Sequence, residues 1–103
     1  MIGLGNWKFH VDTMFYKGDA ILGVADKGGK YDVTIDLADI DIPEISIYGI
    51  TEEGDTITGT AATDLLKGKE IPFSITFENG VASGFLKVPF LGKIKLENGQ
   101  KIG

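Results

Sequence analysis

The feature that most constrains the fold of this chain is a strict alternation of apolar and polar side chains within short segments. In residues 7–12, Trp, Phe and Val alternate with Lys, His and Asp. Segments 31–37 and 71–78 repeat the pattern with Tyr, Val, Ile, Leu and Phe at the apolar positions. Successive side chains of a β-strand point to opposite faces, so each segment predicts a strand with one buried face. No stretch has a helical period, and the predicted fold class is all-β.

Short sequences rich in Gly and Asn separate these segments and predict tight turns, because both residues accept the positive φ that hairpins require. They are Lys17-Gly18-Asp19, Lys27-Gly28-Gly29-Lys30, Glu52-Glu53-Gly54-Asp55, Lys67-Gly68-Lys69, Asn79-Gly80 and Asn98-Gly99. We predict eight strands, at residues 6–15, 20–26, 30–37, 44–50, 55–63, 70–78, 81–88 and 91–97. Short connections make consecutive strands antiparallel, which predicts an up-and-down meander in a single domain, residues 1–103.

A meander of this length can close into a small barrel or fold over as a sandwich. Glycines inside the predicted strands favour closure, because tightly curved barrels need kinks and close backbone approach. These glycines are Gly23, Gly49, Gly59, Gly84 and Gly92. We therefore predict a closed or nearly closed barrel.

One hairpin predicts its own register. If Asn79-Gly80 is a two-residue turn, Glu78 faces Val81, and Gly84 lies opposite Ile75. The same register points Val81 and Phe85 outward, close to Pro89. We predict an apolar patch and a homodimer interface there, with the residues Val81, Phe85, Phe90 and Leu91; the alternative is an exposed apolar side chain without a role.

Composition excludes several classes of function. The net charge is −5, all ten cationic side chains are lysine, and there is no arginine and no cysteine. Without the bidentate arginine fork, and with fifteen acidic groups, a nucleic-acid partner is not expected. Disulfides and thiolate metal sites are excluded. No signal peptide and no apolar run of ~20 residues is recognisable, so we expect a cytoplasmic protein without a membrane partner.

The opening residues resemble a known family. Gly5-Asn6-Trp7, just before the first strand, is similar to the Gly-x-Trp signature of the calycin barrels, which include lipocalins and avidins. Residues 54–60 resemble the Leu-Thr-Gly-Thr strand of avidin-type barrels, and the repeated hairpins resemble small lipocalin-like bacterial domains. The resemblance implies a lipocalin-like barrel with Trp7 near its closed end, beneath a ligand cavity. Lys93 or Lys95 would then cover Trp7, in place of the lipocalin arginine. Gly3 and Gly5 would let the chain cross the barrel end.

An eight-stranded barrel has an interior just wide enough to be filled by side chains or to hold one small ligand. The predicted inward-facing set is Trp7, Phe9, Val11, Leu22, Val24, Tyr31, Val33, Ile35, Ile47, Ile57, Phe73, Ile75, Phe77 and Leu86. Small residues such as Ala61, Ala82 and Gly84 would leave room for a modest apolar cavity. The residues predicted to bind an apolar ligand are Trp7, Phe9, Val11, Tyr31, Val33, Ile35, Phe73, Ile75, Phe77 and Leu86.

Groups that could perform chemistry are few. His10 shares a face with Asp12 and could act with it as a base, although a solvated surface histidine is the simpler interpretation. Asp36, Asp39, Asp41 and Glu44 could hold Ca²⁺, but the EF-hand pattern is missing, and we expect neither a metal nor a cofactor.

Three hypotheses follow. The first is a small barrel that binds an apolar ligand without evident catalysis. The second is a structural or interaction protein with a packed core, acting as a homodimer. The third is a barrel isomerase or cyclase using Tyr31, Tyr48 or His10 for proton transfer.

Overall fold

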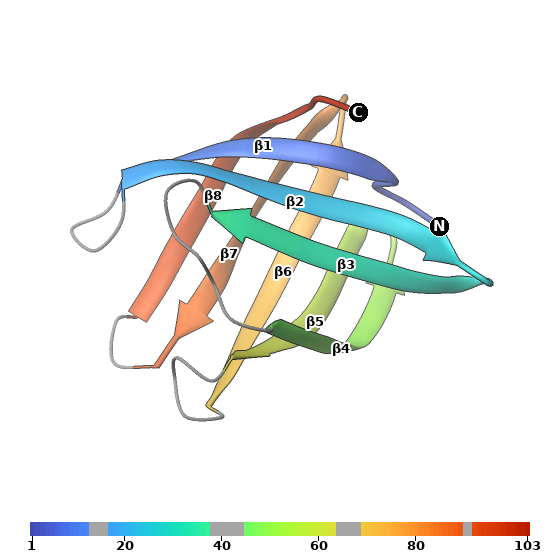
Figure 1. Ribbon diagram of the computed structural model, residues 1–103. Coiled ribbons are helices and arrows are strands. Elements are labelled where there is room, and N and C mark those ends of the chain that lie inside the picture. Colours follow the sequence, from blue (N-terminus) through green and yellow to red (C-terminus); the bar gives the residue numbers. More distant parts are fainter. Residues whose placement is uncertain (13–16, 38–44, 64–68, 90–91) are drawn as a thin grey trace.

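The computed structural model describes residues 1–12, 17–37, 45–63, 69–89 and 92–103, which contain eight strands and no helix (Figure 1). The strands are β1 (Gly5–Asp12), β2 (Lys17–Lys27), β3 (Lys30–Leu37), β4 (Ile45–Glu53), β5 (Thr56–Thr63), β6 (Glu70–Glu78), β7 (Val81–Val88) and β8 (Gly92–Lys101). The predicted all-β class is confirmed.

The strands form one antiparallel sheet in the order β3-β2-β1-β8-β7-β6-β5-β4, curled into a nearly closed barrel. In Figure 1, β1–β3 run at a steep angle to β6–β8 behind them. The corner between β1 and β8 is bridged by a backbone ladder, with Trp7 opposite Lys101 and Lys8 opposite Gln100. The amide of Ile102 extends it by donating to the carbonyl of Asn6 at 2.8 Å.

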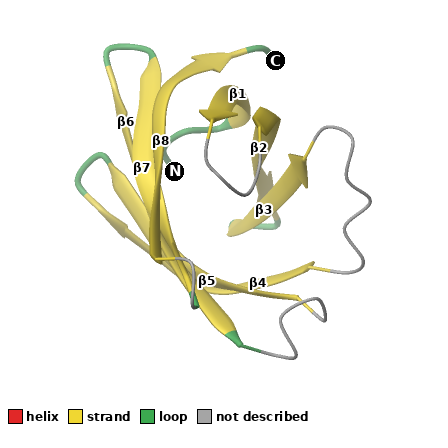
Figure 2. Cartoon of the chain, turned by 90° about the vertical axis from the view of Figure 1, so that its left-hand side faces the viewer, coloured by secondary structure: helices red, strands yellow, loops and turns green. Residues whose placement is uncertain are grey.

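At the opposite corner, no ladder joins β3 to β4 among the described residues. These strands are the two edges of the sheet, and Figure 2 shows them apart. The predicted closed or nearly closed barrel is therefore confirmed in its nearly closed form. The two layers cross at a steep angle, and the strands at this corner diverge instead of running side by side. We call the corner the β3–β4 seam.

Three two-residue turns close the hairpins on one end of the barrel. They lie at residues 28–29, 54–55 and 79–80, between the paired positions Lys27 and Lys30, Glu53 and Thr56, and Glu78 and Val81. Asn79 and Gly80 have φ of 52° and 74°, the conformation that such turns require. The register predicted for this hairpin is confirmed, with Gly84 opposite Ile75.

Gly84 shows why glycine is required inside the barrel wall. A Cβ on Gly84 would lie 1.9 Å from the carbonyl oxygen of Ser74 on the neighbouring strand. No side chain can be accommodated at that distance from a backbone atom. The predicted role of the strand glycines in close backbone approach is confirmed here.

Two predicted turns are not turns. Lys17-Gly18-Asp19 lies within β2, opposite His10, Val11 and Asp12 of β1. Asn98-Gly99 lies within β8, where Asn98 has φ of 55° and the register with β7 shifts between Ala82 and Gly84. This irregularity is a bulge, which bends a strand. β8 continues through it because its last residues pair with β1.

The core lies between the two layers. Among the described residues, thirteen apolar side chains are buried, with Phe9, Ile57 and Ile75 exposed by 2% or less. Nine of the buried residues belong to the predicted inward-facing set, and the other five members of that set pack against them: Tyr31, Ile35, Ile47, Phe77 and Leu86. Ala20, Ala61, Ala82 and Leu96 complete the buried core.

The chain start closes the barrel end that carries the three turns. The indole N–H of Trp7 donates to the carbonyl of Gly3 at 2.8 Å, and the rings of Trp7 and Phe77 lie 5.0 Å apart. A Cβ on Gly3 would lie 2.5 Å from the Phe77 ring, so only glycine lets the chain pass there. The predicted use of Gly3 and Trp7 to cross and fill this end is confirmed.

Candidate functional site

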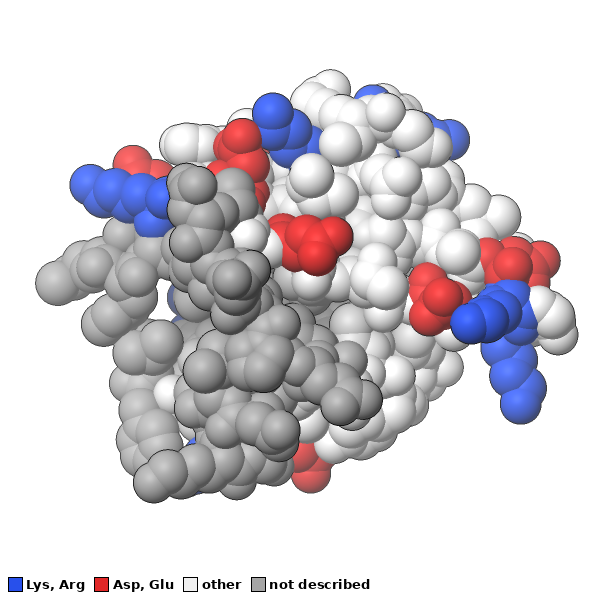
Figure 3. Space-filling model, in the orientation of Figure 1, with Lys and Arg blue, Asp and Glu red and all other residues white. Residues whose placement is uncertain are grey.

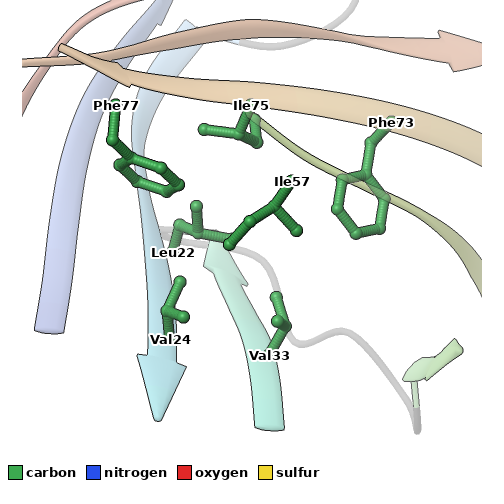
Figure 4. Close-up of a pocket in the computed structure, with 7 residues that line it drawn as sticks. All are labelled: Leu22, Val24, Val33, Ile57, Phe73, Ile75 and Phe77. Carbon is green, nitrogen blue, oxygen red and sulfur yellow. The ribbon is translucent and has the colours of Figure 1, made fainter. Parts of the chain in front are cut away.

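The candidate site is an apolar pocket between the two layers of the barrel. Side chains from β2 and β3 face side chains from β5 and β6 across it, as Figure 4 shows. The gap between them is too narrow to admit a water molecule. Its lining is entirely apolar: Leu22, Val24, Val33, Ile57, Phe73, Ile75 and Phe77.

The structure brings together only part of the predicted ligand set. Val33, Phe73, Ile75 and Phe77 line the pocket. Trp7, Phe9 and Val11 are buried elsewhere in the core, and Tyr31, Ile35 and Leu86 are half-buried against it. Leu22, Val24 and Ile57 also line the pocket but were not predicted to bind ligand. The alternation predicted that these three side chains face inward, but it did not predict where the two layers of the barrel meet.

Small residues on the inner faces do not create further space. A Cβ on Gly99 would lie 2.5 Å from the Phe9 ring, and one on Gly59 would lie 2.7 Å from the Phe73 ring. Ala82 is completely buried. Large aromatic rings therefore occupy the room that the glycines and alanines leave, which makes the interior tighter than we expected.

The β3–β4 seam next to the pocket is joined by side chains. The Tyr31 hydroxyl, at the start of β3, donates a hydrogen bond to the Glu52 carboxylate near the end of β4. The same hydroxyl accepts a hydrogen bond from the Ile2 amide at 2.9 Å. We call this set (Ile2, Tyr31 and Glu52) the seam latch. It joins both edges of the sheet to the chain start.

The latch changes the acidity of Tyr31. Desolvation of the half-buried ring raises the pKa of the Tyr31 hydroxyl above its ordinary value, and the hydrogen bond to Glu52 raises it further. The amide of Ile2 acts in the opposite direction. Tyr31 is therefore a neutral donor at physiological pH and holds its proton more firmly than a free tyrosine.

His10 lies outside the barrel. Its side chain is 73% exposed, as the simpler interpretation of a surface histidine expects, and its Nδ1 lies 3.3 Å from Asp19 on β2, which takes the place of Asp12 in the alternative pair. Asp12 instead lies 3.8 Å from Lys17. The strand pairing explains the difference, because Asp19 is directly opposite His10. Lys8 is 3.3 Å from the same carboxylate, and hydrogen bonds from His10 and Lys8 lower the pKa of Asp19.

Neither this cluster nor Tyr48 reaches the pocket. Tyr48 is 46% exposed on the outside of β4, and its pKa is raised by partial desolvation and by the neighbouring Glu70 carboxylate. Figure 3 shows acidic and basic side chains scattered between uncharged atoms over the face in view. Of the groups in the predicted isomerase, only Tyr31 lies near the interior.

The predicted acidic loop falls largely on residues that the structure does not describe, namely Asp39, Asp41 and Glu44. Asp36 lies on β3. In the described ranges, no three His, Cys, Asp or Glu side chains are placed to hold a metal ion. The same part of the chain contains no helix long and apolar enough to cross a membrane.

Two of the four predicted interface residues are described. Val81 and Phe85 lie half-buried on β7, whereas Phe90 and Leu91 are outside the described residues. The Lys93 ammonium lies 4.3 Å from the centre of the Phe85 ring, and that of Lys87 lies 5.9 Å from it. The expectation that Lys93 covers Trp7 is therefore wrong. Lys93 is on the outer side of β8, while Trp7 faces inward.

Comparison with known proteins yields one partial similarity. The chain is 32% identical over 83 residues to the bifunctional protein HldE of Shewanella sp. strains ANA-3, MR-4 and MR-7. The match includes 76% of this chain but only 17% of the length of each relative. No family model matches the chain, and no solved structure matches it.

Proposed function

We propose that this chain is a soluble, cytoplasmic, calycin-like barrel that binds a small apolar ligand between its two layers, without catalysis of its own. The observation that carries the proposal is the pocket of seven apolar side chains beside the one corner of the barrel that has no ladder. An apolar pocket without polar handles selects its ligand by shape and apolar area. A small aromatic molecule or a short acyl segment fits that chemistry.

The pocket must widen before it accepts a ligand, because it does not admit even water. Widening separates Leu22, Val24 and Val33 from the β5–β6 side. At the β3–β4 seam, within the part of the chain that the structure describes, this movement breaks the Tyr31–Glu52 hydrogen bond and no backbone ladder. An exposed hydrogen bond of this kind contributes about 1 kcal/mol. Ligand contacts of ordinary size can offset that amount.

The test is a titration with the uncharged fluorophore N-phenyl-1-naphthylamine, together with native mass spectrometry of the protein as purified. We expect saturable one-to-one binding that alters Trp7 emission, because the Trp7 ring touches Phe77, which lines the pocket. Val33→Phe should weaken this binding by filling the pocket. Val81→Phe is the matched control, being the same change at a half-buried position outside the pocket.

Circular dichroism establishes that both variants are folded. Absence of saturable binding to the wild-type protein, with only the bare mass of the chain in native mass spectra, would exclude the ligand-binding function. Equal weakening by the two variants would place the fluorophore outside the pocket.

A second candidate is an interaction protein with a packed core, including the predicted homodimer. The tight interior favours it, because Phe9 and Phe73 fill the places that small residues leave. Sedimentation measurements distinguish the two candidates. A dimer that does not bind the fluorophore supports the second.

A further inference from the structure

The outer face of β7 and β8 carries a feature that the interior does not explain. Phe85 points away from the core, and three of the ten lysines gather around it: Lys87, Lys93 and Lys95. Lys95 is directly opposite Phe85, and Lys87 is directly opposite Lys93. We call this group the lysine–Phe85 patch.

Like charges directly opposite each other on neighbouring strands are destabilising. Lys87 and Lys93 are such a pair, and neither has a carboxylate within ion-pair distance in the described part of the chain. The chain as a whole has a net charge of −5, and this patch is a local concentration of positive charge within it. An anionic group placed between the two ammonium groups would relieve their repulsion.

A hollow lies beside the patch. It measures about 420 Å³ and is lined by Glu70, Pro72, Lys87, Val88, Pro89, Gly92 and Lys93. Pro72, Val88 and Pro89 make part of its lining apolar, and Lys87 and Lys93 make part of it cationic. β6, β7 and β8 are each paired on both sides within the sheet, so a partner is recognised here through side chains and not by addition of a further strand.

We propose that the lysine–Phe85 patch and its hollow bind an acidic, extended polypeptide segment of a partner protein. An apolar side chain of the segment enters the hollow, and flanking carboxylates pair with Lys87 and Lys93. The lysines attract the segment by their charge, which acts mainly on the rate and specificity of association.

The chemistry of the patch favours a polypeptide over other anions. A polypeptide can offer an apolar side chain to Pro72, Val88 and Pro89 together with carboxylates to the lysines, whereas a row of phosphates offers nothing to the apolar part of the hollow. A two-fold contact with a second copy is also disfavoured. Such a contact places the same surface on both sides, and it would bring the lysines of one copy against those of the other.

The experiment is fluorescence anisotropy of the full chain with a fluorescein-labelled decapeptide of alternating Glu and Leu. We expect saturable binding that weakens as salt is raised. The double variant Lys87→Glu/Lys93→Glu should raise the Kd by about tenfold or more, through loss of two charge pairs and their replacement by repulsion. Phe85→Ala should weaken binding in the same direction.

The chain offers a matched control in Lys27 and Lys30. They also form a directly opposed lysine pair, flank a two-residue turn and are exposed, but the structure places no aromatic ring against them. Lys27→Glu/Lys30→Glu changes the net charge by the same amount. We expect it to raise the Kd for the peptide by no more than about twofold, through the change in net charge alone. Binding of N-phenyl-1-naphthylamine should be unchanged in both double variants, which separates this proposal from the interior site.

Three outcomes would overturn the proposal. The first is that the two double variants weaken peptide binding equally. The second is that the protein binds phosphatidylserine vesicles and not the peptide. The third is that the protein self-associates without binding the peptide, and that Lys87→Glu/Lys93→Glu abolishes this self-association.

Discussion

The two corners of the barrel are closed in different ways. At the β1–β8 corner, backbone hydrogen bonds join the strands, and the buried Phe9 ring packs against Gly99 of β8. At the β3–β4 seam, a Tyr31–Glu52 hydrogen bond and apolar contacts join strands that have no ladder. The comparison indicates that one corner maintains the fold and that the other can open without dismantling the sheet.

The largest expected effect tests the β1–β8 corner. Phe9→Ala removes a fully buried ring and should lower the free energy of unfolding by about 3–5 kcal/mol. Ile35→Ala, on β3 beside the seam, removes a half-buried side chain and should cost clearly less. Urea denaturation measures both. Equal losses would show that the two corners contribute alike to stability.

A smaller effect tests the seam latch. Tyr31→Phe removes the hydrogen bonds with Glu52 and Ile2 and should lower the free energy of unfolding by about 1 kcal/mol. Amide hydrogen exchange should accelerate in β3 and β4 but not in β1 and β8. Tyr48→Phe, on the outside of β4, serves as the control. Acceleration spread evenly over all strands would contradict a local opening.

The raised pKa of Tyr31 predicts a pH dependence at the same seam. Because the proton is held more firmly in the folded state, this stabilisation is complete below pH 10 and is lost as the pH rises through the folded-state pKa. Thermal denaturation between pH 9 and 11 should therefore show a steeper loss of stability for the wild type than for Tyr31→Phe. Identical slopes would mean that the latch does not couple to folding.

The smallest effect concerns Asp19, beside the β1–β8 corner, whose side chain is 40% exposed. His10 and Lys8 lower its pKa below the ordinary 3.8, so its contribution is present above that value and is lost as the pH falls through the folded-state pKa. Asp19→Asn should slightly flatten the acid limb of the stability curve, less at high salt. If Asp19→Asn changed the free energy of unfolding more than Tyr31→Phe does, the prediction that this surface cluster contributes little to stability would be wrong.

Much of the fold was predictable because its determinants are local. Alternation within 7–12, 31–37 and 71–78 identified strands and their inner faces, and Asn79-Gly80 predicted the register of β6 and β7. The pocket was less predictable. Phe73 and Val33 were assigned to the interior from their own strands, but their meeting with Ile57 and Leu22 depends on how the layers cross.

The pairing of β8 with β1 illustrates what sequence leaves open. Asn98-Gly99 is compatible with a turn or with a bulge, because both place a residue at positive φ. The choice depends on whether the residues that follow find a partner, and Gln100 and Lys101 find one in β1. That partner is more than ninety residues away in sequence, so no local pattern reveals it.

By itself, the sequence determined the strands, their inward and outward faces and the turns at residues 28–29, 54–55 and 79–80, since each follows from periodicity or from local turn chemistry. Only the tertiary structure decided which corner carries a ladder, where the apolar pocket lies and which lysines surround Phe85. These features depend on the curvature and crossing of the whole sheet. The curvature of the sheet depends on all of its strands together, and it brings into contact residues that lie far apart in the sequence.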